Sequence, residues 1–305
     1  MKRLVLIDGH AILHRAYHAF PKNLTTRKGE LVNAVYGFTR MLLGVIEDLK
    51  PDYLAVTFDL PKPTFRHEIF LGYQSKRPQM DAELKGQIER VHQVVKVLSL
   101  PFFEKAGFEA DDVIGTLAKQ ASLRNVATVI VTGDRDIMQL VNRKVKVYAP
   151  IKGFSGAELF GRKKVRQLLN VWPEQIIDYK ALVGDPSDNY PGVPGVGPKT
   201  ATKLLGKYKD LDTIYNSASK IEPRVAKKLI EDKELAFLSQ KLAKIVTNVP
   251  IKLSLKACRV HDYDQEKTIK LFEELEFKSL INKLPGIEPF VSEKKKAKNG
   301  QIKLL

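Results

Sequence analysis

Three short apolar segments, each closed by an aspartate, constrain the fold of this chain most strongly. The segments are residues 3–8, 54–59 and 128–134. Their side chains are mainly aliphatic or β-branched, and each segment is too short for a helix, which is typical of strands buried on both faces of a parallel sheet. The segments between them have helical spacing of apolar residues, at 32–49, 80–98 and 110–121. Strands that alternate with helices predict an α/β fold with a mostly parallel sheet, to which residues 145–148 add a further strand.

After about residue 160 the pattern becomes mainly helical. The expected helices are 163–169, 173–183, 199–208, 223–230 and 233–245. We therefore expect an α/β domain over residues 1–172 and a helical region over 173–285. Residues 286–305 are polar and basic and are expected to form a mobile tail.

The composition narrows the class of protein. With 51 Lys plus Arg against 35 Asp plus Glu in 305 residues, the formal net charge is +16, which favours a polyanionic partner such as nucleic acid. The one cysteine, Cys258, excludes an intramolecular disulfide and a Cys-rich zinc site. Asp8 interrupts the apolar start, and no apolar run approaches the roughly 20 residues that span a bilayer. We expect a cytoplasmic protein with no membrane partner.

The aspartates that close the three segments are Asp8, Asp59 and Asp134. Because ligands of an open parallel sheet bind beyond the carboxyl ends of its strands, these side chains are expected to share one crevice. Six further acids are candidates for the same crevice, because they open a helix, follow Asp134 closely or lie in the turn at 184–189: Glu109, Asp111, Asp112, Asp136, Asp185 and Asp188. Any one of them alone is explained by a helix cap or an Asx turn.

Nine carboxylates cannot share a crevice unless positive charge compensates them. A donor set of oxygen atoms selects Mg²⁺ or Mn²⁺ over zinc. Several carboxylates also suit two or more ions about 4 Å apart, the arrangement used for in-line phosphoryl displacement. The sequence therefore predicts metal-assisted hydrolysis of a phosphodiester, with no covalent protein nucleophile.

A glycine-rich turn in the second half, residues 192–201, is the next candidate site. Gly195 and Gly197 permit a tight turn, and the amides of the helix that follows can hold a phosphate oxygen. Lys199 and Lys203 lie on one face of that helix. The pattern is typical of a helix-hairpin-helix element, which grips the backbone of a duplex without reading bases.

The segment 61–78 mixes basic and aromatic side chains. Arg66, Lys76 and Arg77 lie among Phe65, Phe70 and Tyr73. Such a mixture suits a channel for a single strand, whose backbone follows the charges and whose bases stack on the rings. An ordinary crossover loop whose aromatic residues complete the core explains it equally well.

Five motifs together resemble the 5′→3′ exonuclease domain of bacterial DNA polymerase I, a member of the flap endonuclease family. They are LIDG at 6–9, FRHE at 65–68, EADD at 109–112, TGDRD at 132–136, and GDPSDN at 184–189 followed by PGVPG at 191–195. The resemblance runs in family order to about residue 280. It implies a PIN/flap-endonuclease-like fold and a metal-dependent 5′→3′ exonuclease and 5′-flap endonuclease. Such an enzyme removes RNA primers and 5′ flaps in DNA replication and repair.

The resemblance also implies roles for individual residues. One acid group, nearer a first metal ion, is Asp8, Asp59, Glu109, Asp111 and Asp112; the other, nearer a second ion, is Asp134, Asp136, Asp185 and Asp188. A helical arch or clamp at about 60–98 carries Arg66, Lys76 and Arg77 as the catalytic candidates. The DNA-binding candidates are Arg15, Tyr73, Gly192, Gly195, Gly197, Lys199, Thr200 and Lys203. The family's helix-three-turn-helix element, matched by the glycine turn, sometimes also holds K⁺.

Two positions depart from the family pattern. Gln74 stands where members usually have a lysine that contacts the scissile phosphate. We expect Lys76 or Arg77 to substitute for that lysine, with a change in the cleavage rate or in the position of the cut. Pro186 fixes one backbone angle in the GDPSDN motif, and both acids of the motif remain. A length of 305 residues leads us to expect a stand-alone protein. The resemblance implies a nuclease acting on 5′ flaps, single-stranded 5′ ends and RNA–DNA primer junctions, and we expect it to be a monomer.

Two other functions stay open at this point. A non-catalytic protein that binds DNA junctions would keep the basic surface and retain the acids as structural residues. A metal-dependent phosphatase would use Asp134 and Asp136 as its Asp-x-Asp pair, but it leaves the glycine turn unexplained.

Overall fold

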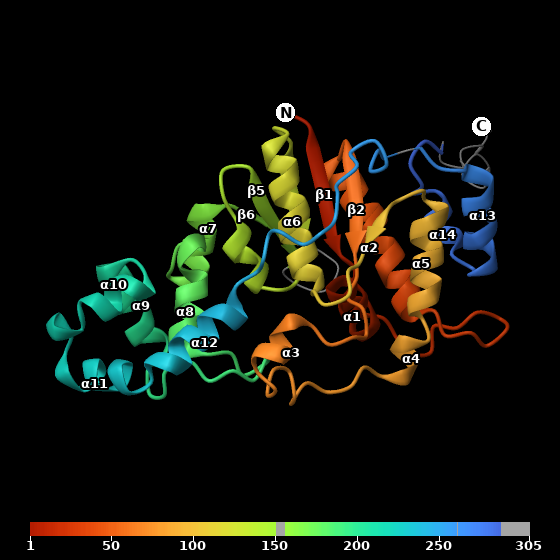
Figure 1. Ribbon diagram of the computed structural model, residues 1–305. Coiled ribbons are helices and arrows are strands. Elements are labelled where there is room, and N and C mark those ends of the chain that lie inside the picture. The colour runs from red at the N-terminus through yellow and green to blue at the C-terminus, as the bar shows by residue number, and fades with distance from the viewer. Residues whose placement is uncertain (151–155, 261, 288–305) are drawn as a thin grey trace, which may run out of the picture.

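A computed structural model describes residues 1–150, 156–260 and 262–287. Its centre is a six-stranded sheet in the order β3-β2-β1-β4-β5-β6 (Figure 1). The strands are β1 (Arg3–Asp8), β2 (Tyr53–Thr57), β3 (Phe102–Phe103), β4 (Ala127–Val131), β5 (Val145–Pro150) and β6 (Ala157–Phe160). The first five are parallel, and β6 pairs antiparallel with β5 at the edge. The mostly parallel sheet predicted from the sequence is confirmed.

The register of the central strand sets the position of the candidate site. In β1, Ile7 pairs with Val56 of β2 on one side and with Val131 of β4 on the other. Because the three strands are parallel and in register, their carboxyl ends meet at one edge of the sheet. The chain segments that follow all three strands therefore start from the same place.

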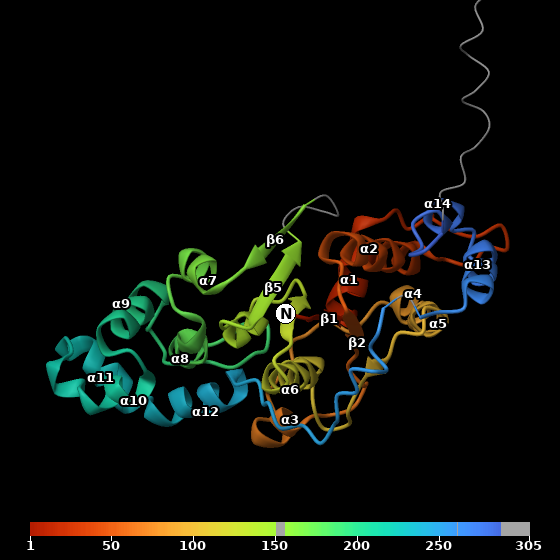
Figure 2. The ribbon, with the colours of Figure 1, turned by 90° about the horizontal axis from the view of Figure 1, so that it is seen from above.

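The two faces of the sheet are covered by different helices. Leu4 and Leu6 of β1 pack on the side of α6 (Ala110–Leu123), whereas Val5 and Ile7 pack on the side of α1 (Gly9–Ala19), α2 (Asn33–Leu49) and α5 (Ile88–Val97). Figure 2 shows α2 and α6 on opposite sides of the strands. The single helix expected over 80–98 is divided into α4 (Ala82–Lys85) and α5. Full burial on both faces explains why the strands read as uninterrupted apolar runs.

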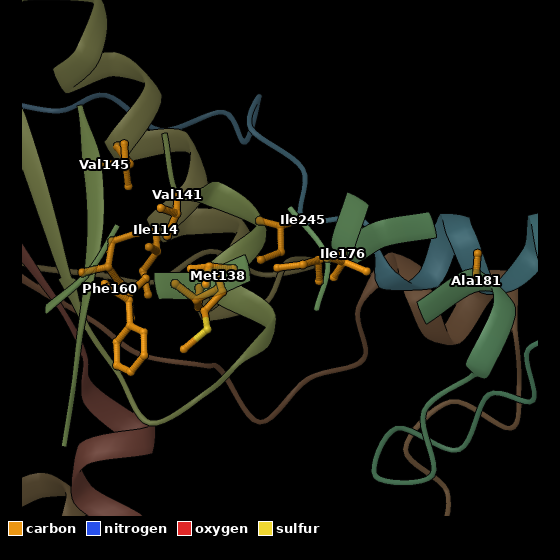
Figure 3. Close-up of a cluster of buried hydrophobic side chains, with 14 of the residues drawn as sticks. Ile114, Met138, Val141, Val145, Phe160, Ile176, Ala181 and Ile245 are labelled. Atoms are coloured by element: carbon orange, nitrogen blue, oxygen red, sulfur yellow. The ribbon is translucent and has the colours of Figure 1, made fainter. Parts of the chain in front are cut away.

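The second half of the chain is helical. Its elements are α7 (Arg162–Leu169), η2 (Pro173–Gln175), α8 (Ile176–Val183), α9 (Pro198–Tyr208), α10 (Leu211–Asn216), η3 (Ala218–Lys220), α11 (Pro223–Glu231) and α12 (Lys233–Ala243). One buried cluster joins this half to the sheet, and Figure 3 shows Ile114, Met138, Ile176 and Ile245 within it. The helical region and the sheet therefore share a core.

The last helices return to the α/β part. α13 (Gln265–Glu274) packs against α5, and α14 (Lys278–Ile281) follows it, far from α9 and α11 (Figure 1). Phe272 and Phe277 are buried there with the core of the α2 face. Nearly all of the tail expected at 286–305 lies outside the described residues, which end at 287. No helix in the described ranges is long and apolar enough to cross a membrane.

Candidate active site

Three acids stand at the carboxyl edge of the sheet. Asp8, the last residue of β1, caps α1 and accepts a hydrogen bond from the Thr132 hydroxyl at 2.8 Å. Asp59, beyond β2, accepts one from the first amide of α6 at 2.7 Å. Asp134, beyond β4, accepts one from the amide of Asp136 at 2.7 Å. The local fold thus fixes each carboxylate through backbone or hydroxyl donors and leaves lone pairs for a cation.

The N-terminus of α6 adds two more acids to this edge. Glu109 is the N-cap of the helix, and its carboxylate lies 3.2 Å from the Tyr73 hydroxyl. Burial raises the pKa of Asp8 and of Glu109, each to about 7. Burial, followed by repulsion from Asp134 and Asp8, raises the pKa of Asp111 well above its ordinary value. Burial thus disfavours the ionised form of these carboxyl groups at neutral pH, and a bound cation would favour it.

Asp112 of the same helix is fixed by protein partners. Its fully buried carboxylate accepts two hydrogen bonds from the Arg66 guanidinium, at 2.7 and 2.9 Å, and two from the amides of Glu109 and Val246, at 3.1 and 2.9 Å. Arg66 lies on α3 (Phe65–Ile69), is 2% exposed, and donates its other N–H groups to carbonyls at the end of α12 and just beyond it. The pair ties α3 to α6 and α12. A direct part of either residue in metal binding or catalysis stays a prediction.

A second group of acids lies between η1 (Asp136–Leu140) and the loop after α8. One carboxylate oxygen from each of Asp136, Asp185 and Asp188 lies within 4.8 Å of the others. The Lys180 ammonium, on α8, contacts both Asp136 and Asp185. Burial raises the pKa of Asp136 to about 6, although Lys180 opposes the shift. For Asp185, Lys180 and hydrogen bonds from Ser187 outweigh burial and lower the pKa.

The chemistry of these donors fits a hard divalent cation. All the acids in the two groups offer carboxylate oxygens, which Mg²⁺ and Mn²⁺ prefer. Burial and mutual repulsion make the ionised form of several of them unfavourable, and a cation with two charges relieves both. Asp134 links the groups, because it interacts with Asp8 and Asp111 on one side and with Asp136 on the other.

The segment after α3 crosses both acid groups. The buried Tyr73 hydroxyl lies 3.4 Å from Asp188 as well as near Glu109. The Gln74 amide side chain donates to Asp188 at 3.1 Å, so the residue that replaces the usual lysine neutralises no charge there. Lys76 and Arg77 follow and are exposed. The structure therefore places Tyr73 and Gln74 against the acids and leaves Lys76 and Arg77 at the surface.

The glycine turn is closely packed. Gly192 has φ of +65°, and a Cβ there would lie 2.3 Å from the amide nitrogen of Gly184. Gly195 has φ of +75°, and the Lys228 ammonium donates to its carbonyl at 3.1 Å. Gly197 is the N-cap of α9. The turn therefore requires glycine for both conformation and space at Gly192.

The remaining DNA-binding candidates are spread over two places. Lys199 and Lys203 are exposed on α9, where Thr200 is half-buried. Arg15 is half-buried on α1, a helix that lies well apart from α9 in both views (Figures 1 and 2). The structure does not bring Arg15 and the α9 lysines together.

Three functional side chains were missed by reasoning from the sequence. Thr132 holds Asp8, and Gln139 ties η1 to the chain at the end of α12 through hydrogen bonds to Ala243 and Ile245, both 3.0 Å long. Lys180 contacts the second acid group. Two of them leave a signal in the sequence: Thr132 is the first residue of the TGDRD motif, and Lys180 is a cation within a mainly apolar helix five residues before Asp185.

The fold and the two acid groups define a class of enzyme, a nuclease with a resolvase-like catalytic domain. Residues 3–170 match the family model described as "5'-3' exonuclease, N-terminal resolvase-like domain". Residues 171–266 match "5'-3' exonuclease, C-terminal SAM fold". The chain belongs to the 5′-3′ exonuclease family.

Relatives of two lengths support this membership. A 5'-3' exonuclease of Aquifex aeolicus is 38% identical over 287 residues, which are 94% of this chain and 96% of that protein. DNA polymerase I of Chloroflexus aurantiacus is 42% identical over 93% of this chain and 31% of its own length. The chain thus spans about a third of the DNA polymerase I relatives it matches.

Solved structures share the fold at low sequence identity. A bacteriophage T5 flap endonuclease, in a pseudo-enzyme-product complex with DNA and metal ions, has a TM-score of 0.66 and 20% identity, covering 90% of this chain and 100% of that one. The catalytic core of Rad2 in complex with DNA substrate has a TM-score of 0.56 and 16% identity, covering 90% and 87%. The predicted fold class is confirmed by these likenesses and by the family models.

Proposed function

We propose that this chain is a metal-dependent 5′→3′ exonuclease and 5′-flap endonuclease that hydrolyses phosphodiester bonds. The observation that carries the proposal is the convergence of two carboxylate groups at the carboxyl edge of the sheet, linked by Asp134. Exposed cations on two sides, on the segment after α3 and on α9, provide a surface for a polyanion. RNA primers and 5′ flaps formed in DNA replication and repair are the substrates we propose.

The proposed metal is Mg²⁺, with two or more ions and with Mn²⁺ as a substitute. Asp8, Asp59, Glu109 and Asp111 would hold one ion, and Asp136, Asp185 and Asp188 another, with Asp134 between them. When bound, such ions supply an activated water and stabilise the leaving oxygen. The protein's own part is to hold its carboxylates in place, which Thr132 does for Asp8 and Ser187 for Asp185.

The cations have separate proposed roles. Lys76 and Arg77 hold the 5′ strand and stabilise the reacting phosphate, because both are exposed and closely follow Gln74, whose side chain contacts Asp188. Arg66 is a positioning residue. Its hydrogen bonds to Asp112, to a carbonyl of α12 and to a carbonyl just beyond α12 hold α3 in place. Lys199, Lys203 and the amides at the start of α9 hold a duplex phosphate. A K⁺ ion at the glycine turn is part of the same proposal.

The proposed partners are DNA with 5′ flaps or single-stranded 5′ ends and RNA–DNA primer junctions. We propose that the chain acts as a monomer in the cytoplasm, with residues 1–172 for catalysis and 173–285 mainly for duplex binding. Binding should weaken as salt increases, because phosphate contacts release counterions.

A 5′-labelled flap substrate tests the proposal. Labelled products should form with Mg²⁺ and vanish with chelator. Asp134→Asn should abolish cleavage and leave flap binding largely intact. Asp212→Asn, the same change at an exposed acid of α10, is the matched control and should cut normally.

Each competing function predicts a different product pattern. Wild-type cutting by Asp134→Asn would refute the site assignment. Tight flap binding without any Mg²⁺-dependent product would identify a junction-binding protein. Hydrolysis of a small phosphomonoester without DNA cutting would identify a phosphatase.

A further inference from the structure

Lys180 places one ammonium among the three acids of the second group. Its Nζ contacts carboxylate oxygens of Asp136 and Asp185, and the side chain is only 16% exposed. Asp188 completes the group, whose ligand oxygens lie within 4.8 Å of one another. The ammonium therefore competes directly for oxygens that a divalent cation would need.

Beside this group lies a buried hydroxyl that makes no hydrogen bond within the described part of the chain. Tyr190 is 3% exposed, and its hydroxyl finds no partner among the residues that the structure describes. Its electrostatic neighbours are Lys180, Asp136, Asp185 and Asp188. A buried hydroxyl without a partner is unfavourable, so its presence here points to a second arrangement of the group in which it is satisfied.

We propose that Lys180 is an exchangeable counter-cation of the second acid group. Without a metal it neutralises part of the charge of Asp136 and Asp185. A divalent cation displaces the ammonium, which then donates a hydrogen bond to the Tyr190 hydroxyl. This inference rests on the proposed function, because it concerns acids of the same site.

The side-chain chemistry suits an exchange of this kind. Lysine carries a compact charge on a flexible stem, so its ammonium can change partners without movement of α8. An ammonium this close to the acids repels an incoming divalent cation, and its ion pairs must break before the cation can bind. Lys180 therefore lowers the metal affinity of the group while it stabilises the metal-free protein.

The test is Mn²⁺ binding to the full chain, followed through the EPR signal of free Mn²⁺. An Asp111→Asn background weakens the first acid group, so that the second dominates the measurement. In this background Lys180→Met should bind Mn²⁺ at least tenfold more tightly, because the competing charge is gone. Lys180→Arg keeps the charge and should bind more weakly than Lys180→Met.

Lys144→Met is the matched control. Lys144 directly precedes β5, and its partly buried ammonium donates a hydrogen bond to the carbonyl of Ser122 at 3.1 Å. Its removal deletes the same charge far from the carboxyl edge of the sheet. Mn²⁺ affinity should not change.

Tyr190→Phe gives a second and independent readout. The hydroxyl has no partner to lose in the metal-free protein, so the thermal unfolding temperature without metal should not fall. Mn²⁺ affinity should fall about three- to tenfold, the value of one hydrogen bond that forms only after displacement.

Mn²⁺ affinity in Lys180→Met that equals or falls below that of the background would overturn the inference. If Lys180→Met does not fold, unchanged Mn²⁺ affinity in Tyr190→Phe would overturn it. Failure of the proposed function gives another result, because the wild-type chain would then cut no 5′-flap substrate with Mg²⁺, whatever its Mn²⁺ affinity.

Discussion

Asp112→Asn separates a structural role of this acid from a role as metal ligand. The carboxylate is fully buried, carries four hydrogen bonds and neutralises Arg66, which is itself buried. Asparagine preserves the shape but leaves the guanidinium with only Glu109 as a charged partner, at the longer distance of 3.4 Å. Breaking a buried ion pair from one side costs about 3–5 kcal/mol. At about 2–4 °C for each kcal/mol, the thermal unfolding temperature should fall by roughly 10 °C.

Thermal unfolding with chelator and Mn²⁺ binding below the transition are the two measurements. Asp178→Asn is the matched control, because Asp178 is also buried but accepts hydrogen bonds from Gln240 and Leu211 instead of facing a cation. Burial raises the pKa of Asp178. Asparagine keeps one acceptor oxygen there and leaves no buried cation unpaired, so the control should lose less than the roughly 3–5 kcal/mol expected at Asp112, about 1–3 kcal/mol.

A double variant completes the experiment. Arg66→Met with Asp112→Leu removes both charges, so it should recover part of the stability that Asp112→Asn loses. The reasoning is refuted if Asp112→Asn unfolds at the wild-type temperature but binds Mn²⁺ more weakly. That outcome would make Asp112 a metal ligand and Arg66 free to act at the phosphate.

Other predictions concern pH, salt and the glycine turn. Burial raises the pKa of Asp8 and Glu109 to about 7 in the folded state. The folded metal-free protein therefore binds more protons than the unfolded chain between about pH 4 and 7, and its stability falls as pH rises through this interval. Its unfolding temperature with chelator should be lower at pH 8 than at pH 5.5. The rise in unfolding temperature on adding Mg²⁺ should be larger at pH 8. An unfolding temperature with chelator that does not change with pH would contradict this prediction. Replacing Lys199 and Lys203 together by alanine should reduce the slope of log Kd against log salt by about 2, because each lysine is expected to contact one phosphate. An unchanged slope would show that neither lysine contacts a phosphate. Gly192→Ala should destabilise the protein by more than 1 kcal/mol, because φ is +65° and the new methyl meets the chain at Gly184, while Gly206→Ala, with open space around it, should not.

The parts of the fold that sequence predicted are those set by local periodicity. The segments ending in Asp8 and Asp59 form neighbouring strands because uninterrupted aliphatic runs require burial on both faces. The positions of their carboxylates follow from parallel register alone. The expected helix at 80–98 is interrupted at Gly86 and Gln87. The buried side-chain amide of Gln87 donates a hydrogen bond to Asn33 and accepts one from the amide of Ala34, and local periodicity does not show these contacts.

Long-range contacts explain the rest of what sequence missed. Arg66 looks like a cation of an exposed basic segment, but its partners lie 46 residues away on α6 and 176 residues away on α12. The return of α13 to α5 depends on burial of Phe272 and Phe277 against the α2 face, which no local pattern distinguishes from an ordinary amphipathic helix. Side chains that act by contact across the fold carry no periodicity of their own.

The two buried cations of the site differ in a way that matches their proposed roles. The planar Arg66 guanidinium donates two hydrogen bonds to Asp112 and two to backbone carbonyls. It therefore cannot leave without breaking several directed hydrogen bonds. The Lys180 ammonium has no fixed plane, and its contacts are to carboxylates that a stronger cation can take. Beside it, the Tyr190 hydroxyl offers an acceptor that is not yet used. Arg66 should therefore keep its contacts to Asp112 and α12 with or without metal, whereas Lys180 should exchange its partners when a metal binds.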